Sequence, residues 1–331
     1  MPRKLNNKTL SIRVFPRIHL GLLSMSGEGY RLNGGIGVTI SAPEAVVTFR
    51  ASKAFSLEDQ RDKPFKTSEL NRIARCLTDG LGRFGVNNIP LSISISGSMP
   101  SHCGFGSATS IRLACLEGMF LKLDISVGRK RLVELSGRGG TSGIGINTYF
   151  QGGLVLDVGR KGGNLSPSSA LEHAPHEPLT LFKVPMPRWR VGTCLTPRAQ
   201  GISGRLEREF FASNAKLTLR DVERASHIAL FGLIPGAIEQ DCKTFCKAIN
   251  DMQRTRWKNA EWALHGVPLQ RIKRLLLREG AEAVAMSSLG PCLMFMGPDI
   301  KAKFEKLRQF FPEGSLNLAY MRNGGRVIRY D

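Results

Sequence analysis

Residues 100–110 read PSHCGFGSATS and lie between two regular patterns. Before them, residues 91–95 (LSISI) alternate apolar and polar side chains with a period of two, which indicates a half-buried strand. After them, apolar residues recur at helical spacing, namely Ile111, Ala114, Cys115, Met119 and Phe120. The sequence therefore predicts a strand, a glycine-rich loop and a helix, in that order.

The glycines of this loop fall at the start of the predicted helix. The first backbone N–H groups of a helix have no acceptor within it, and the helix dipole is positive there, so such a loop can bind an anion. Of the 36 glycines in the chain, 24 lie in the first 163 residues. Clustered glycines indicate tight turns or close approach of backbone to a ligand, so we expect anion-binding loops in this half.

The rest of the chain mixes strands and helices and shows no internal repeat. We expect strands at 10–14, 38–49, 153–158 and 190–195, helices at 218–233, 237–252 and 269–278, and two short strands around Ala283 and Leu293. The stretch 162–187, rich in Ser, Pro, Gly and His, is the best candidate for a boundary. We therefore predict an α+β (α/β) protein with domains at residues 1–170 and 171–331.

The chain has 47 Lys and Arg against 27 Asp and Glu, a net charge of +20 that is spread along its length. Such an excess indicates an anionic ligand: nucleic acid, a membrane surface, or a phosphate or carboxylate substrate. Aromatic residues make up only 7% and form no ladder, which argues against single-stranded nucleic acid. Apolar runs fall short of a membrane span. We expect small anionic substrates, no nucleic acid and no membrane.

The cysteines and the N-terminus indicate the compartment. Seven cysteines at irregular spacing, with no CxxC pair, predict reduced and mostly buried thiols. Residues 1–15 are basic but lack the apolar core of a secretory signal. We therefore expect a cytoplasmic protein.

The form P-x-x-x-G-[LF]-G-S-[SA] at residues 100–108 resembles the phosphate-binding loop of the galactokinase, homoserine kinase, mevalonate kinase and phosphomevalonate kinase (GHMP) superfamily. The turn Ser-Ser-Leu-Gly-Pro at 287–291 falls where that superfamily has a C-terminal glycine motif. The resemblance implies a two-domain GHMP-kinase-like fold.

Residues 137–145 (GRGGTSGIG) with Gly152 and Gly153 resemble a further element of the superfamily, in which the kinases carry a catalytic aspartate. The matching position here is Gly145. A glycine cannot accept a hydroxyl proton, so the usual phosphoryl transfer would need another carboxylate. The scaffold resembles a kinase, but the chemistry differs.

Five blocks in order resemble one branch of this superfamily, the β-ribofuranosylaminobenzene 5′-phosphate synthases: residues 17–23, 33–37, 137–145, 233–241 and 287–291. Many archaeal members carry an aspartate where this chain has Asn33, so contacts to substrate there can differ. The resemblance implies a C-ribosyltransferase. It would couple phosphoribosyl pyrophosphate (PRPP) to an aromatic or heteroaromatic acid of the 4-hydroxybenzoate or 4-aminobenzoate type, releasing pyrophosphate and CO₂.

Within that resemblance we assign roles to the matching residues. Arg17, His19 and Arg138 would be catalytic, although His19 could equally be a core histidine. PRPP would be bound by Ser101, Gly104, Gly106, Ser107, Thr109, Gly139, Gly140, Thr141, Ser142 and Gly143. The aromatic acid would be bound by Asn33, Gly34, Gly35, Ser287, Ser288 and Gly290. Mg²⁺ would serve as cofactor, with Asp157 or Asp241 as ligands, unless these are helix or turn caps.

The same resemblance implies a homodimer and a place in the biosynthesis of methanopterin-type cofactors or C-nucleosides. Two alternatives stay open. A small-molecule kinase of the GHMP scaffold would use ATP, with a carboxylate other than position 145 as base. More remotely, a basic RNA-binding protein would use the +20 charge.

Overall fold

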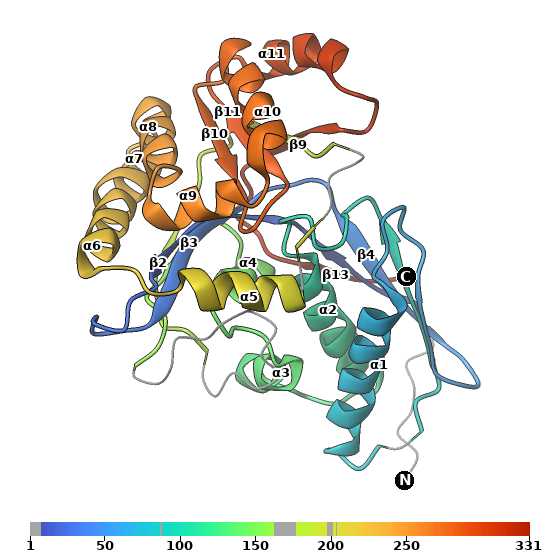
Figure 1. The fold of residues 1–331 in the computed structure, drawn as a ribbon. Helices are drawn as coiled ribbons and strands as arrows, with labels where there is room; N and C mark the ends of the chain where they lie inside the picture. The colour runs from blue at the N-terminus through green and yellow to red at the C-terminus, as the bar shows by residue number, and fades with distance from the viewer. Residues whose placement is uncertain (1–7, 87, 162–176, 197–200, 203) are drawn as a thin grey trace.

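The computed structural model describes residues 8–331 except 87, 162–176, 197–200 and 203. Within these residues the strands form three sheets (Figure 1). The first has the order β13 (Val327–Tyr330), β1 (Leu10–Val14), β4 (Ala45–Ala51), β6 (Leu91–Gly97) and β5 (Ser56–Asp59). The second has the order β2 (Arg17–Ser24), β3 (Asn33–Thr39), β7 (Leu154–Asp157) and β8 (Thr180–Val184). The third has the order β10 (Ala283–Met286), β11 (Leu293–Met296), β9 (Arg190–Cys194) and β12 (Leu316–Tyr320).

The helices cover these sheets. In chain order they are α1 (Thr67–Gly82), α2 (Ser107–Lys122), α3 (Arg129–Ser136), α4 (Ile144–Phe150), α5 (Arg205–Asn214), α6 (Leu219–Ile228), the π-helical η1 (Ala229–Leu233), α7 (Ile234–Ile238), α8 (Cys242–Met252), α9 (Arg256–Ala263), α10 (Gly266–Arg278), α11 (Ile300–Leu307) and the short 3₁₀ turn η2 (Arg308–Phe310). α10 and α11 pack on the third sheet (Figure 1). No helix in the described part of the chain is both long and apolar enough to cross a bilayer.

The predicted strand, loop and helix are confirmed as β6, residues 98–106 and α2. In β6 the side chains of Leu91, Ile93 and Ile95 are buried, as their alternation requires. α2 is buried on most of its surface because it packs against β1, β4, α1 and α3. A helix that is enclosed by other elements needs apolar residues on all sides, which explains its weak amphipathic pattern.

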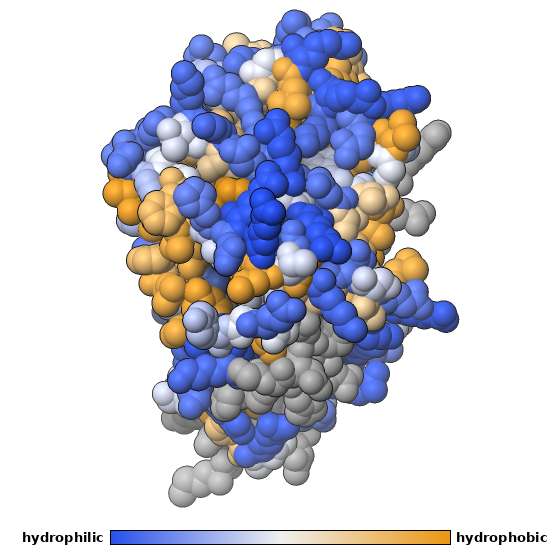
Figure 2. Space-filling model, turned by 60° about the vertical axis from the view of Figure 1, so that its left-hand side comes forward, coloured by the Kyte–Doolittle hydropathy of each residue, from blue (hydrophilic) through white to orange (hydrophobic). Residues whose placement is uncertain are grey.

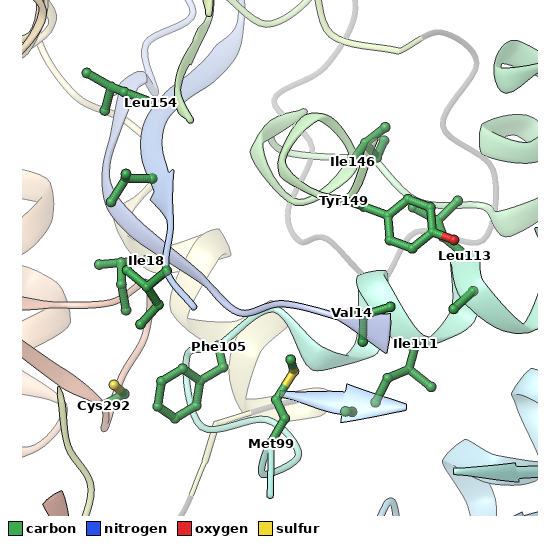
Figure 3. Packing of buried hydrophobic residues seen from close by; sticks show 14 of the residues in the cluster. Val14, Ile18, Met99, Phe105, Ile111, Leu113, Ile146, Tyr149, Leu154 and Cys292 are labelled. Carbon is green, nitrogen blue, oxygen red and sulfur yellow. The ribbon is translucent and has the colours of Figure 1, made fainter. Parts of the chain in front are cut away.

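Phe105 anchors the loop between its two glycines. Its side chain is 1% exposed and belongs to the main core. Figure 3 shows the ring pointing into this core, which also holds Ile18, Met99 and Cys292. Gly104 and Gly106 have φ angles of 94° and 78°, which residues with a side chain rarely adopt. The glycines therefore allow the chain to bend around an apolar anchor at the start of α2.

Two predicted elements are wrong in extent. The predicted strand 38–49 is divided between β3 and β4, because residues 40–44 turn the chain and include Pro43, which has no N–H to donate. The predicted helix 237–252 is interrupted after α7, where Gln240 has a φ of 59°. A new helix, α8, then begins with Asp241 as its N-cap.

The predicted domain boundary lies in residues 162–176, outside the described part of the chain. Two strands that follow this gap join sheets made from the N-terminal half: β8 pairs with β7, and β13 pairs with β1. The helices and strands of the described residues confirm the predicted fold class, mixed α+β.

Candidate active site

Three segments that lie far apart in the sequence meet at the start of β2. The Arg17 amide donates to the carbonyl of Phe105 at 3.0 Å. The His19 amide donates to Ser287 Oγ at 2.9 Å, and that hydroxyl donates to the carbonyl of Gly104 at 2.6 Å. These hydrogen bonds join β2, the loop before α2 and the turn at 287–291, as the order of the sequence motifs predicts.

A small cavity of about 70 Å³ opens where these segments meet. It is lined by Arg17, His19, Leu22, Thr109, Arg138, Gly139, Thr141, Ser142, Gly145, Ile146, Glu207, Phe211, Glu261 and Ser288. Eight of the predicted site residues are in this lining: Arg17, His19, Thr109, Arg138, Gly139, Thr141, Ser142 and Ser288. The structure therefore brings residues from six segments of the sequence to one concave site.

Arg17 and Arg138 place two positive charges at this cavity. Burial and the Arg138 charge lower the pKa of Arg17 to about 10, and burial and the Arg112 charge lower the pKa of Arg138 to about 10. Arg17 donates to the carbonyl of Gly104 at 2.5 Å, while its Nε has no hydrogen-bond partner. Arg138 Nε donates to Thr109 Oγ1 at 3.0 Å.

Neither guanidinium is paired with a carboxylate among the described residues. Two mostly buried cations that repel each other are costly unless an anion lies between them or beside them. The Thr141 hydroxyl, which also lines the cavity, likewise has no partner. This arrangement can bind a phosphate or carboxylate group with charge-assisted hydrogen bonds.

The first turn of α2 adds backbone donors. The amides of Thr109 and Ser110 both donate to the carbonyl of Gly106 at 3.1 Å. The preceding amides, of Ser107 and Ala108, have no acceptor within the helix and remain for a ligand. A Cβ on Gly106 would lie 2.9 Å from the Arg17 side chain, so glycine is required for the arginine to reach this place.

His19 is held as a neutral imidazole. Burial, together with the charges of Arg17 and Lys258, lowers its pKa well below the usual value. Its Nε2 lies 3.2 Å from Ser142 Oγ, at the edge of the cavity. A Cβ on Gly35 would lie 2.8 Å from the same nitrogen. Gly35, predicted to bind the aromatic acid, therefore makes room for the histidine ring.

Gly145, which the sequence resemblance matches to the kinase aspartate, faces Thr109. A Cβ built on Gly145 would lie 3.2–3.4 Å from atoms of the Thr109 side chain. The space beside Gly145 thus contains a threonine that accepts the hydrogen bond of Arg138. The carboxylates of the cavity lining come from other elements, Glu207 on α5 and Glu261 on α9.

Known structures share this fold. The chain is similar to mevalonate kinase from L. major with bound R-mevalonate (TM-score 0.68, 13% identity, 98% of each chain). It is also similar to homoserine kinase from Cytophaga hutchinsonii (TM-score 0.66, 16% identity, 98% of each chain). These two structures confirm the predicted GHMP-kinase-like fold. Because their sequence identity to this chain is low, the similarity supports the fold and nothing further.

Sequence relatives are more specific. The chain is 32% identical over 289 residues to the β-ribofuranosylphenol 5′-phosphate synthase of Methanothermobacter thermautotrophicus, which covers 86% of this chain and 87% of the relative. The chain belongs to the β-ribofuranosylphenol 5′-phosphate synthase family. The enzymes of the same name from Archaeoglobus fulgidus and Methanocaldococcus jannaschii are 28% and 27% identical and cover 92% and 94% of this chain. No protein-family model matches.

The prediction of this family, and of an enzyme of its type, is confirmed by these relatives. In this chain the position that the sequence resemblance matches to the kinase aspartate is a glycine, Gly145, which lies against Thr109.

Asp157, predicted as a metal ligand, holds the glycine loop instead. Its Oδ2 accepts the amide of Gly143 at 3.0 Å and its Oδ1 accepts the amide of Gly159 at 3.0 Å. The residue is fully buried, and burial raises its pKa to about 7. Both carboxylate oxygens are therefore engaged with backbone, which favours the turn-cap alternative.

Asp241 is the N-cap of α8. Its carboxylate is exposed and accepts the amide and the hydroxyl of Thr244 at 3.0 and 2.5 Å. No group of three or more His, Cys, Asp or Glu among the described residues could hold a metal ion. The helix-cap alternative is thus the one that the structure favours for Asp241.

Other predicted residues support the cavity from behind. Ser287 links His19 to Gly104, Ser101 Oγ accepts a hydrogen bond from Arg61 at 2.8 Å, and the Gly34 amide donates to the Thr141 carbonyl at 3.3 Å. Further residues that shape the loops without lining the cavity are Gly104, Gly106, Ser107, Gly140, Gly143, Asn33, Gly35 and Gly290. Asn33 has a φ of 69° and donates weakly to Gly140, at 3.5 Å.

The sequence analysis missed Glu261. On α9 its Oε1 accepts the Trp257 indole N–H at 2.7 Å and its Oε2 is paired with Lys258. Lys258 also donates to the carbonyl of Met286 at 2.6 Å, next to the 287–291 turn. A Lys and a Glu three residues apart usually mark an exposed helix face, and only the neighbouring tryptophan hinted at burial.

Proposed function

We propose that this chain joins PRPP to the ring carbon of an aromatic or heteroaromatic carboxylic acid, of the 4-hydroxybenzoate or 4-aminobenzoate type. The products would be a C-riboside 5′-phosphate, pyrophosphate and CO₂. One observation carries the proposal: two guanidiniums without a carboxylate partner face a small cavity at the start of α2. The printed name of the relatives, synthases of a ribofuranosylphenol phosphate, describes a product of this class.

Two bonds break in this reaction and one bond forms. The bond from the anomeric carbon to pyrophosphate breaks, the ring carbon that bears the carboxylate bonds to the sugar, and the carboxylate leaves as CO₂ with its electron pair restoring aromaticity. Negative charge grows on the departing pyrophosphate. Arg138, which lines the cavity at the first turn of α2, is placed to stabilise that charge, and such stabilisation is the largest single contribution in many such sites.

The acceptor would be held on the other side of the cavity. Arg17 reaches the cavity beside Ser288 and neutral His19, so its free Nε–H can bind the carboxylate of the aromatic acid. Holding the acid and the sugar in line lowers the entropic part of the barrier. Because the ring carbon loses CO₂ and not a proton, the missing base at position 145 is no obstacle to this route.

Mg²⁺ would enter the site bound to the phosphates of the substrate. Magnesium commonly binds through substrate phosphates with one or two carboxylates. The described residues offer no three-ligand cluster, and Asp157 and Asp241 are engaged as caps. Of the two carboxylates that line the cavity, Glu261 accepts from Trp257 and Lys258, and Glu207 is the one that such a metal–phosphate complex would meet. When bound, the metal would offset phosphate charge.

We also propose a cytoplasmic homodimer that serves methanopterin-type or C-nucleoside biosynthesis. All seven cysteines are free thiols, which is usual in a reducing compartment. Figure 2 shows apolar side chains gathered along one side of the molecule. Phe231 and Ile238 are 72% and 61% exposed, and α7 contacts β8, where Leu181 and Phe182 are also exposed. Such apolar surface is typical of a subunit interface.

One incubation tests the reaction. The protein is supplied with PRPP, Mg²⁺ and carboxyl-labelled 4-hydroxybenzoate, and labelled CO₂ and pyrophosphate are followed beside an ATP control. Equal release of both products, lost in Arg138→Ala, supports the proposal. Turnover of ATP without release of CO₂ would overturn it in favour of the kinase. A panel of other aromatic and heteroaromatic acids then identifies the acceptor.

A further inference from the structure

A second and larger hollow lies beside the cavity. This arginine groove, of about 690 Å³, lies between α1, the first turns of α2 and the end of α3. Its charged lining consists of Lys66, Arg72, Arg75, Arg83, Arg112 and Arg138 against Glu69, Asp79, Glu134 and Glu207. Cations outnumber carboxylates, and His102 adds a further polar group. None of the cations on α1 takes part in the mechanism proposed above.

α1 and its two cap residues supply six of these ten charged residues. Arg72, Arg75, Asp79 and Arg83 follow one another at spacings of three and four residues, which places them on the same side of the helix. Arg72 shares Glu69 with Arg112. No ion pair or hydrogen bond occupies the side chains of Lys66, Arg75 or Arg83 among the described residues. These three charges are therefore free to meet a ligand.

Arg112 forms a fixed floor. Its guanidinium donates to Glu69 at 3.2 Å and to the carbonyl of Ser136 at 3.3 Å, and its side chain is 14% exposed. Its Nε is buried and has no hydrogen-bond partner in the part of the chain that the structure describes. A rigid, mostly buried arginine with an unused N–H in a groove is a feature of a built anion site, since leaving that donor unpaired costs about 1–3 kcal/mol.

The groove and the small cavity are joined. Arg138, and Glu207 on α5, line both. The groove, of about 690 Å³, has room for a sugar phosphate. A molecule with anionic groups at two ends can therefore place one end at Arg138 and extend the other along α1.

We infer that the arginine groove binds the 5′-phosphate end of the phosphoribosyl donor, through Arg75, Arg83 and Arg112. This inference rests on the proposed function. The reacting end of the donor must lie next to the aromatic acid at Arg17, so the pyrophosphate belongs at Arg138 and the 5′-phosphate at the far end. Binding energy from this remote phosphate would then position the anomeric carbon.

Two probes separate the two ends. Ribose 5-phosphate carries only the remote phosphate, and inorganic pyrophosphate carries only the leaving group. Each is titrated calorimetrically into wild type, the double variant Arg75→Ala/Arg83→Ala, Arg138→Ala and the control Arg271→Ala on exposed α10. Removal of guanidiniums that contact a phosphate weakens binding by about tenfold or more.

We expect the double variant to lose at least about tenfold in affinity for ribose 5-phosphate, with a matching rise in KM for PRPP and unchanged pyrophosphate binding. Arg138→Ala should show the reverse preference, and Arg271→Ala should match wild type. Unchanged ribose 5-phosphate affinity in the double variant would overturn the inference while wild-type release of CO₂ still supported the proposed function. If wild type releases no CO₂ from the labelled acid, the proposed function falls and the inference falls with it.

Discussion

Replacing Arg138 with methionine separates the needs of the fold from those of the site. Methionine keeps an unbranched apolar stem of similar length but removes the charged guanidinium. If the guanidinium is present to bind an anion, the ligand-free protein should become more stable without it. If Arg138 is an ordinary structural residue, the same change should destabilise the protein.

The structure gives the size of the effect. The pKa of Arg138 is lowered from 12.5 to about 10 by burial and by Arg112. The pKa of Arg138 is lower in the folded protein than in the unfolded chain, so folding disfavours the charged guanidinium. This free-energy cost is fully present at every pH below about 10. At about 1.4 kcal/mol per pKa unit, this costs the free protein about 3 kcal/mol. Loss of the hydrogen bond to Thr109 lowers the free energy of unfolding by about 1 kcal/mol, so Arg138→Met should raise it by about 2 kcal/mol in total.

Urea unfolding at neutral pH, with and without inorganic pyrophosphate, measures both consequences. The ligand should raise the free energy of unfolding of wild type and have no effect on Arg138→Met. Arg61→Met is the matched control: Arg61 is buried and is paired with Asp59 at 2.6 Å, so its loss should cost about 3 to 5 kcal/mol. A loss of stability in Arg138→Met as large as that of the control would refute the reasoning.

Three further predictions concern the same scaffold. Burial raises the pKa of Asp157 to about 7, above its unfolded value of 3.8. The free energy of unfolding should therefore fall by about 4 kcal/mol as pH rises from about 4 to about 7 and level off above about 7. An equal slope in Asp157→Asn would contradict this. Glu117→Gln breaks the ion pair with Arg326 and should lower the free energy of unfolding by about 3 kcal/mol in urea, with pyrophosphate affinity unchanged as the check. Gly145→Ala places a Cβ 3.2–3.4 Å from Thr109 and should weaken pyrophosphate binding about tenfold in calorimetry; full affinity would show that the contact yields without consequence.

Much of the site could be predicted from local patterns. The alternation in residues 91–95 and the glycines at 104 and 106 specify a strand, a tight loop and a helix start by backbone geometry alone. The convergence of Arg17, Arg138 and Ser288 could be predicted only through the family resemblance, because nothing local to any one of them indicates its partners.

The remaining parts depend on tertiary packing. Glu207 and Glu261 lie on α5 and α9, and only the placement of these two helices brings them to the cavity. Asp157 is the last residue of a buried strand, a position that suits a metal ligand as well as a turn cap. The two amides that settle its geometry, from Gly143 and Gly159, could not be foreseen from spacing.

The pairing of β13 with β1 has a consequence for how the molecule is made. During synthesis on the ribosome, residues 10–14 emerge early, but the strand that covers their outer edge consists of residues 327–330. The outer edge of β1 in the first sheet therefore stays unpaired until the rest of the polypeptide has been translated. Exposed strand edges invite aggregation, so we expect chaperone dependence and translation rate to govern the yield of this protein.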